Sequence, residues 1–432
     1  MEHLRKYLIG ILCALFLCSI ALINALAKEN SDYNSLIVIA KESLTDLKRP
    51  EGLLKHRGIT GIHKVNKNTY VVLRNEAKSL EEQISELKAS NLFKTVEPNY
   101  TLTIDSERIY TEVSHYDSED DTLSNQKDDN SIKPNDQGYA SQYYLKQINA
   151  NKAWNLTTGD SNLVAVLDTG VDADHPDLVG KVIGRIGKES EDLTDNISHG
   201  TGIAGLIAAH TNNHEGIAGI SWNTMILSIK ITDDFGQARV SDVVSALEDV
   251  YTHDAKIAQI SLSTNQYSQA LEEAIKLAES RGIFIISTGG NSGINEVRYP
   301  AGFDGALGVG AVNEFNELES YSSKGNHITL VAPGASIYTT SSLFDYEAQS
   351  GTSFAAPQVA GAVALIRSVA PDLTCQEIRD ILIDSAKDLG ALGQDEQFGY
   401  GLLNTKKAVE LAQESTIEEE QTELVKSWVI RN

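Results

Sequence analysis

The sequence predicts an α/β protein whose main domain is a parallel sheet with helices on both faces, preceded by a small α+β domain. In residues 143–414, short and almost wholly apolar strands alternate with helical patterns, which is typical of a sheet buried on both faces. Residues 33–104 have a strand and helix pattern of their own. A polar, acidic stretch separates the two regions, so we expect an exposed linker there.

Apolar runs and helical segments follow one another in regular order through the main domain. We expect strands at 164–167, 225–229, 257–262, 283–286 and 307–312. We expect helices at 202–209, 240–251, 268–281 and 356–369. This alternation predicts parallel strands, because each helix carries the chain back to the same edge of the sheet.

The small domain has a different order. We expect strands at 35–40, on either side of a turn within 62–73, and at 96–104, with a helix at 80–89. A further helix within 44–54 would complete a β-α-β-β-α-β order of the ferredoxin-like kind, although Pro50 and Gly52 weaken the helical pattern there.

The chain begins with the pattern of a secretory signal. Basic Arg5 and Lys6 precede an apolar run at 7–23, and a small-x-small cleavage motif ends at Ala27. We therefore expect residues 1–27 to be removed from a secreted, extracellular protein. An uncleaved membrane anchor is the alternative.

The cysteines support no internal disulfide framework. Cys13 and Cys18 would leave with the signal, so Cys375 would be alone in the secreted product. It lies beside an amphipathic run with no histidine near it in sequence, and we expect a packed residue rather than a nucleophile.

The formal net charge of -24 bears on the choice of partner. Nucleic acids and anionic membranes are themselves polyanions, so neither is expected as a stable partner. An acidic surface also simply favours solubility. We expect domains at 28–107 and 141–414, an acidic linker at 108–140 and a charged tail at 415–432.

Three segments put a reactive side chain next to small residues. Asp168 ends an apolar strand before Thr-Gly, His199 lies in Ser-His-Gly-Thr-Gly, and Ser353 lies in Gly-Thr-Ser-Phe-Ala-Ala-Pro before an apolar helix. The carboxyl ends of parallel strands are where sites form, and helix starts offer free N–H donors. Serine needs a base within reach and a third group that orients the base, and Asp, His, Ser is a known chain order for such a triad.

These segments resemble the subtilisin family of serine proteases, and the resemblance runs from about residue 143 to 412. It implies that Asp168 orients His199, which moves the proton of Ser353 while Ser353 forms an acyl-enzyme. It also implies an oxyanion donor at Asn291, after a Gly-Gly pair that follows a core strand, with the Ser353 N–H as the second donor. An inactive protease-like binding protein is an alternative of another class.

The resemblance also implies a substrate site. The edge that pairs with the substrate backbone corresponds to Ser261, Leu262 and Ser263. The Tyr-Pro pair at 299–300 aligns with a pair in the family and puts Arg298 at the floor of the first specificity pocket, where many relatives have glycine. A guanidinium there would favour a carboxylate, so we expect cleavage after Glu or Asp. The alternative is an arginine that turns to solvent or pairs with Glu296.

Residues 28–107 resemble the inhibitory prodomain of this family, whose C-terminal tail enters the active site and is cut there. This implies a zymogen with an autocatalytic cleavage. The count from the strand at 96–104 favours a cut after Glu107, with Asp105, Glu112 and Glu97 as the other candidates.

A narrow preference is typical of secreted subtilisin-like enzymes that mature one precursor, such as the leader-removing proteases of lanthipeptide biosynthesis. The chain resembles those enzymes and also broad-specificity degradative ones. The expected partners are a peptide or protein substrate and the chain's own prodomain, and a monomer that requires no cofactor is expected.

Relatives hold calcium with carboxylates and carbonyls, which suit a hard cation. Asp177 matches a family ligand position, and the loop at 210–216 corresponds to a ligand loop, although it is about one residue longer. Calcium is therefore the candidate ion. His210 and His214 lack the carboxylate context of a zinc site.

Overall fold

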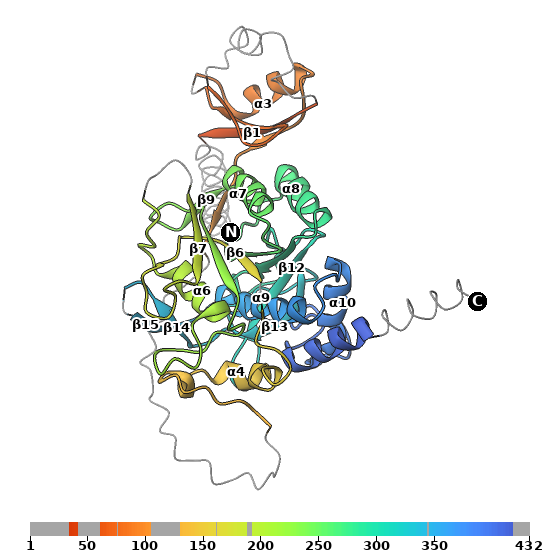
Figure 1. Ribbon diagram of the computed structural model, residues 1–432. Coiled ribbons are helices and arrows are strands. Elements are labelled where there is room, and N and C mark those ends of the chain that lie inside the picture. The colour runs from red at the N-terminus through yellow and green to blue at the C-terminus, as the bar shows by residue number, and fades with distance from the viewer. Residues whose placement is uncertain are drawn as a thin grey trace, which may run out of the picture. The chain divides into compact units, whose positions relative to one another are not determined.

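The computed structural model describes two compact units, which are treated separately here (Figure 1). The units are Met1–Tyr100 and Thr101–Asn432. Within them the structure describes residues 34–41, 61–75, 77–104, 130–160, 162–187, 192–343 and 345–417. The predicted signal, the helix expected within 44–54, Asp105, Glu107 and Glu112 lie outside these ranges, as do most of the linker and of the tail.

The first unit is a sheet with one described helix. Its elements are β1 (Ser35–Ala40), β2 (Ile62–Lys64), β3 (Thr69–Leu73), α3 (Leu80–Ala89) and β4 (Phe93–Pro98). The strands pair antiparallel in the order β2-β3-β1-β4. A capping box starts α3, because Ser79 accepts the N–H of Glu82 and the Glu82 carboxylate accepts the N–H of Ser79. This arrangement agrees with the predicted α+β pattern.

The single strand expected at 96–104 is wrong, because the structure has two. β4 ends at Pro98, which cannot donate a further ladder hydrogen bond. After Asn99 and Tyr100 the chain forms β5 (Thr101–Thr103), which belongs to the second unit and pairs antiparallel with β9 (Gln237–Arg239).

The second unit contains a seven-stranded parallel sheet, which confirms the predicted fold class. Its strand order is β13-β12-β11-β10-β6-β8-β7, and each neighbouring pair is parallel. The strands are β6 (Leu163–Asp168), β7 (Val182–Gly187), β8 (Met225–Lys230), β10 (Ile257–Ile260), β11 (Phe284–Thr288), β12 (Ala306–Val312) and β13 (Ile328–Pro333). Outside the edge strand β7 their residues are buried, apart from the half-buried Leu163, Met225 and Thr329, as expected from the near-continuous apolar runs.

Helices cover both faces of this sheet (Figure 1). On one face α7 (Val240–Thr252) packs against α8 (Gln269–Ser280), and on the other α6 (His199–Ala208) packs against α9 (Thr352–Val369). This unit also contains η3 (Tyr139–Ser141), α4 (Tyr143–Gln147), α5 (Ala150–Ala153) and α10 (Cys375–Ser385), and residues 405–417 are helical as well. Both α6 and α9 begin earlier than the sequence predicts, so their first turns include His199 and Ser353.

Helix α9 is the central helix of the core, because all its residues from Thr352 to Arg367 are buried. It is rich in alanine, as a helix packed on all sides must be. Pro357 has no N–H, so the Ser353 carbonyl lacks its helical donor and accepts the Ser261 hydroxyl instead, at 3.2 Å.

A hairpin that the sequence did not predict lies against α6. It consists of β14 (Ile337–Ser341) and β15 (Asp345–Gln349). Thr339 donates to the carbonyl of Gly202 at 2.6 Å and Thr340 to that of Thr201 at 2.7 Å. The hairpin therefore fixes the helix that begins with His199.

Candidate active site

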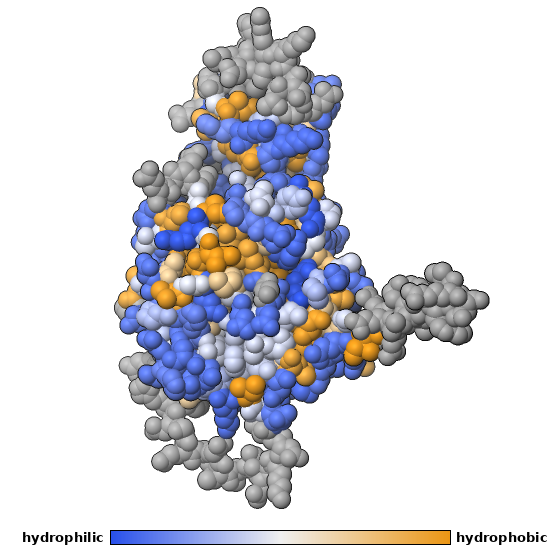
Figure 2. All heavy atoms as spheres, in the orientation of Figure 1, coloured by the Kyte–Doolittle hydropathy of each residue, from blue (hydrophilic) through white to orange (hydrophobic). Residues whose placement is uncertain are grey.

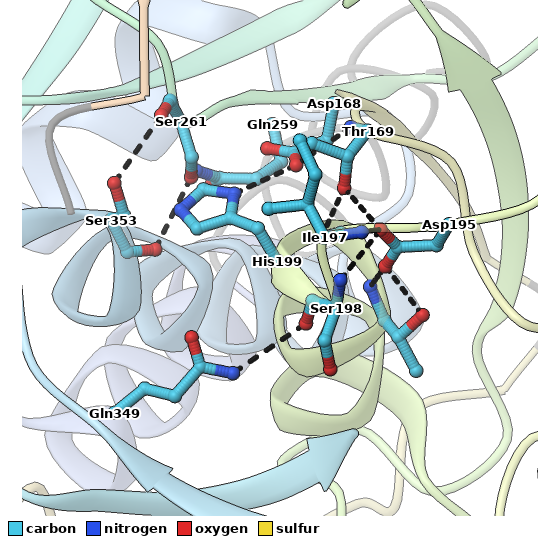
Figure 3. A network of polar contacts seen from close by, with 12 residues as sticks. Asp168, Thr169, Asp195, Ile197, Ser198, His199, Gln259, Ser261, Gln349 and Ser353 are labelled. Atoms are coloured by element: carbon cyan, nitrogen blue, oxygen red, sulfur yellow. Dashed lines mark hydrogen bonds and ion pairs between the residues drawn. The ribbon is translucent and has the colours of Figure 1, made fainter. Parts of the chain in front are cut away.

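Three elements bring the predicted triad residues to one end of the parallel sheet. Asp168 is the last residue of β6, His199 is the first of α6, and Ser353 is the second of α9. Figure 3 shows the imidazole of His199 between Asp168 and Ser353. This is the carboxyl end of the strands, where the sequence predicts a site.

Asp168 and His199 form a buried pair. His199 Nδ1 lies 2.7 Å from Asp168 Oδ1, which also accepts the N–H of Thr169 at 2.8 Å. A carboxylate can only accept, so Nδ1 carries the proton and Nε2 is the basic nitrogen. Nε2 has no hydrogen-bond partner among the described residues. The rings of His199 and Phe354 pack edge to face, with their centroids 5.3 Å apart.

Two glycines next to the triad residues have backbone positions that other residues would not fit. A Cβ on Gly200 would lie 2.1 Å from the carbonyl of Gly170, so only glycine lets the first turn of α6 lie so near the loop after β6. Gly351, which precedes α9, has φ +145°, a conformation that other residues rarely adopt. The small residues around the motifs thus have a backbone reason.

The Ser353 hydroxyl lies at the substrate edge. Its Oγ donates to the carbonyl of Ser261 at 3.3 Å, and the Ser261 hydroxyl donates to the carbonyl of Ser353. Rotation about the Cα–Cβ bond is the motion that would turn this Oγ toward His199.

The Asn291 amide has its orientation set by Thr352. Asn291 Oδ1 accepts the N–H of Thr352 at 3.0 Å and its hydroxyl at 2.8 Å. The amide oxygen is therefore occupied, and the Nδ2 donor faces away from Thr352. The first N–H groups of α9 lie beside it, at the positive end of the helix.

The predicted substrate edge already pairs with a segment of this chain. Ser263 exchanges two backbone hydrogen bonds with Thr103, both 3.0 Å long, and Gly236 accepts the N–H of Ile104 at 3.1 Å. Leu102 of the same segment is fully buried. Figure 2 shows hydrophobic residues gathered on one face of this unit, in the region of β6 and β9.

Arg298 lies against the same edge. Its Nε donates to Ser263 Oγ at 3.1 Å, its Nη1 lies 3.2 Å from a Glu296 carboxylate oxygen, and its side chain is 14% exposed. A Cβ on Gly290 would lie 2.5 Å from Arg298 Cγ, so the arginine stem packs on the residue before Asn291. The structure therefore shows Arg298 in contact with Ser263 of the predicted substrate edge, and it contains the alternative pairing with Glu296.

Asp177 is fully buried beside the loop at 210–216. It accepts from Asn213 Nδ2 at 2.9 Å and from the N–H of Ile217 at 2.7 Å. Asp136, also buried, accepts the N–H of Asn212 at 2.9 Å. Burial raises the pKa of both carboxyl groups.

This donor set fits a hard cation better than a transition metal. Its two carboxylates are ligands of the kind that suit Ca²⁺, and in this structure their oxygens accept N–H groups of residues 212, 213 and 217. No group of three or more His, Cys, Asp or Glu side chains that could hold a metal occurs in the described part of the chain. Calcium would therefore need backbone and amide oxygens as well.

Several functional candidates were not predicted. Asp195 organises the start of α6, Gln259 lies near the triad, and Asp136 belongs to the region assigned as linker. Each is a polar residue in a polar or short segment, and nothing in its spacing distinguishes it from its neighbours. Cys375 is buried, as expected, and burial raises the pKa of its thiol.

The fold and this site define the class of α/β serine peptidases. Residues 159–401 match the subtilase family, Peptidase_S8, which is more than half of the chain. The chain therefore belongs to the subtilase family and is a subtilisin-like serine endopeptidase.

Relatives of known class agree. The chain is 37% identical to the thermophilic serine proteinase of Bacillus sp. (strain AK1), over 64% of this chain and 69% of that protein. It is 33% identical to thermitase of Thermoactinomyces vulgaris, over 64% of this chain and 99% of thermitase. It is 36% identical to the halolysin-like extracellular serine protease Nep of Natrialba magadii, over 64% of this chain but only 52% of Nep.

Helices long and apolar enough to cross a membrane are absent from the residues that the structure describes.

Proposed function

We propose that this peptidase hydrolyses peptide bonds through Asp168, His199 and Ser353. The observation that carries the proposal is the buried Asp168–His199 pair, 2.7 Å apart, beside the start of the helix that bears Ser353. His199 Nε2 would take the Ser353 proton as Oγ attacks the scissile carbonyl, and would return it to the leaving amine as the acyl-enzyme forms. Water would then attack the acyl-enzyme with the same base.

Asn291 Nδ2 and the Ser353 N–H would stabilise the oxyanion of the tetrahedral intermediate. The hydrogen bonds from Thr352 to Asn291 Oδ1 support this role, because they leave the amide N–H₂ group as the free end. The second donor belongs to the positive end of α9, where negative charge is favoured.

Selectivity for Glu or Asp before the cut would come from Arg298. Its guanidinium is largely buried, and it is held by Ser263, the residue that pairs with the bound segment. A substrate carboxylate would replace or share the contact with Glu296. An apolar substrate side chain would make no such contact, and Arg298 would keep only its contact with Glu296.

The pairing of β5 supports self-processing at one particular bond. Thr103 is opposite Ser263 in an antiparallel register. Asp105 lies outside the described residues, and it is the first acidic residue after this paired segment, which ends at Ile104. The bond after Asp105 then becomes the first choice, ahead of Glu107, while Glu97 is paired within β4 of the other unit. An aspartate before the cut agrees with an Arg298 pocket.

The test compares the purified secreted protein with its Ser353→Ala variant by intact-mass spectrometry. We expect wild-type chains that begin at Ser106, and uncut chains in the variant. A start after Glu107 would move the bond but keep the acidic preference, a start after an apolar residue would contradict that preference, and identical uncut chains would contradict self-processing.

Fluorogenic peptides with the sequence Leu-Thr-Ile-X test the pocket directly. For X equal to Asp we expect kcat/KM roughly 10- to 100-fold above that for Asn or Phe, the range of a hydrogen bond to a charged group. Arg298→Gly should abolish this ratio while the variant keeps activity on X equal to Phe. Equal wild-type rates for Asp and Phe would favour the broad degradative alternative.

A narrow preference would also support the maturation of one secreted precursor, such as a lanthipeptide leader. Export is proposed from the N-terminal pattern and agrees with the extracellular relative named above. A reporter fused to residues 1–30 tests it.

We also propose that Asp136 and Asp177 hold calcium with the loop at 210–216. The ion would neutralise the negative charge of these two carboxylates, whose pKa values are raised by burial.

A further inference from the structure

A second buried carboxylate lies next to His199 and takes no part in the proposed chemistry. Asp195 precedes α6 and is 1% exposed. Its Oδ1 accepts the Thr169 hydroxyl at 2.7 Å and the N–H groups of Ile197 at 3.1 Å and Ser198 at 2.8 Å. Figure 3 shows this carboxylate at the centre of the polar network around the start of α6.

The other oxygen of Asp195 reaches into the helix. Its Oδ2 accepts the N–H of Thr201 at 2.8 Å and the Thr201 hydroxyl at 2.7 Å. One carboxylate therefore binds residues on both sides of His199. The start of a helix has N–H groups without intrahelical partners and favours negative charge, and α6 has no side-chain cap from Ser198.

The same carboxylate also binds the segment that carries Asp168. Thr169 follows Asp168 directly, and its hydroxyl donates to Asp195 while it accepts the N–H of Gly200 at 2.9 Å. The two halves of the Asp168–His199 pair are thus joined through Asp195 and Thr169 as well as directly.

Ser198 has an unfavourable backbone conformation that the contacts with Asp195 and Ser341 stabilise. Its φ is +71°, in the left-handed region that residues other than glycine seldom adopt. Asp195 captures its N–H, and its hydroxyl donates to Ser341 Oγ of the hairpin at 2.7 Å. The unfavourable conformation immediately before His199 is held by these contacts.

We infer that Asp195 is a positioning residue for catalysis, which keeps the His199 imidazole aligned with Asp168 and with the serine nucleophile. It touches no reacting atom. The inference rests on the proposed role of His199. Asp195→Asn would keep the size of the side chain but replace one acceptor oxygen by a donor, so at least one of the donors would lose its acceptor. Misalignment on this scale costs turnover rather than substrate binding.

The test measures kcat and KM on Leu-Thr-Ile-Asp peptides, with active sites counted by burst titration and folding checked by thermal unfolding. For Asp195→Asn we expect kcat to fall about 10- to 100-fold with KM nearly unchanged. The matched control is Asp395→Asn, because Asp395 accepts the N–H groups of Ala391, Gln397 and Phe398 in a remote loop. Its kcat should stay at the wild-type value.

A second pair of variants covers the case in which Asp195→Asn fails to fold. Thr169→Val removes the bridging hydroxyl and should lower kcat, whereas Thr169→Ser keeps it and should restore kcat. His199→Ala, measured alongside, separates the two hypotheses. Wild-type kcat in Asp195→Asn or Thr169→Val, with His199→Ala inactive, would overturn the role of Asp195 alone; an active His199→Ala would overturn the proposed triad.

Discussion

In the proposed pocket, Glu296 would compete with an acidic substrate side chain for Arg298. It is partly exposed and pairs with one guanidinium nitrogen. Glu296→Gln should therefore raise kcat/KM for peptides with an acidic residue before the cut by about two- to fivefold, the worth of an exposed ion pair.

The control is the same substitution in the Arg298→Gly background, where it should have no effect. This double-mutant cycle isolates the interaction of the two residues. An equal gain in both backgrounds would mean that Glu296 repels the substrate directly.

His327 is a buried residue near Arg298 whose protonation state should affect the stability of the fold. Burial and, secondarily, the nearby Arg298 lower its pKa, and its Nε2 lies 3.0 Å from the Gly289 carbonyl. The folded protein thus keeps the ring neutral while the unfolded chain binds a proton below its ordinary pKa. Stability should fall as the pH drops below about 6.5, by at most about 1.4 kcal/mol per pH unit from this group.

His327→Gln keeps a donor for Gly289 and cannot titrate. Thermal unfolding at pH 7.5 and pH 5, in the Ser353→Ala background that prevents self-digestion, should show a smaller pH difference in this variant. An unchanged difference would assign the pH dependence to other groups.

At the level of elements, the contact between α6 and β14 allows no additional atom. A Cβ on Gly205 would lie 2.1 Å from Thr340 Oγ1. Gly205→Ala should therefore destabilise the fold by about 1–3 kcal/mol through overpacking, although alanine normally gains about 1 kcal/mol over glycine inside a helix.

Calorimetry of the Ser353→Ala protein measures this change. A Thr340→Ala background removes the hydroxyl at 2.1 Å and the methyl group at 2.9 Å and leaves only the Cβ at 3.0 Å, so Gly205→Ala should cost less there. Equal costs in both backgrounds would locate the strain elsewhere.

The elements that the sequence predicts well are those whose own residues determine their burial. The segment that forms β12 is apolar throughout because both of its faces are covered. Helix α3 begins with a capping box whose two residues, Ser79 and Glu82, are close together in the sequence. The hairpin β14–β15 was missed because its contacts with α6 are hydroxyl-to-carbonyl hydrogen bonds, which leave no apolar periodicity. The break between β4 and β5 was missed because it depends on which strand each half pairs with.

For the whole molecule, calcium removal tests how the loop at 210–216 is stabilised. Burial raises the pKa of Asp136 and of Asp177 because it disfavours the charged carboxylates, hydrogen bonds from the loop partly offset this effect, and a bound cation would offset it further. A chelator should lower the Tm of the Ser353→Ala protein by several degrees, as expected for loss of a ligand held well above its Kd.

This decrease should be absent in Asp136→Asn and should fade at acid pH, where the two carboxyl groups bind protons instead of the ion. Asp395→Asn is the matched control and should keep the full chelator effect. A wild-type Tm that ignores the chelator would leave the loop held by its hydrogen bonds alone.

The site as a whole was predictable as far as strand ends and motif resemblance reach. Asp168, His199 and Ser353 each carry a local signal, because a reactive side chain beside small residues at the end of a strand or the start of a helix is visible in sequence. Asp195 carries none: it is one of 60 acidic residues, and only the fold shows that five donors converge on it.

The pairing of β5 with β9 and Ser263 has a consequence for protein engineering. An enzyme that must first cut off its own prodomain becomes active only if its pocket accepts the residue before that cut. Under the proposed self-cleavage after Asp105, a library that varies Arg298 alone would recover only pockets that still accept this aspartate, and variants with other preferences would stay uncut. Libraries that vary Arg298 and Asp105 together would allow pockets with other preferences to mature. The residue found at position 105 in each active clone would then indicate which side chain its pocket prefers.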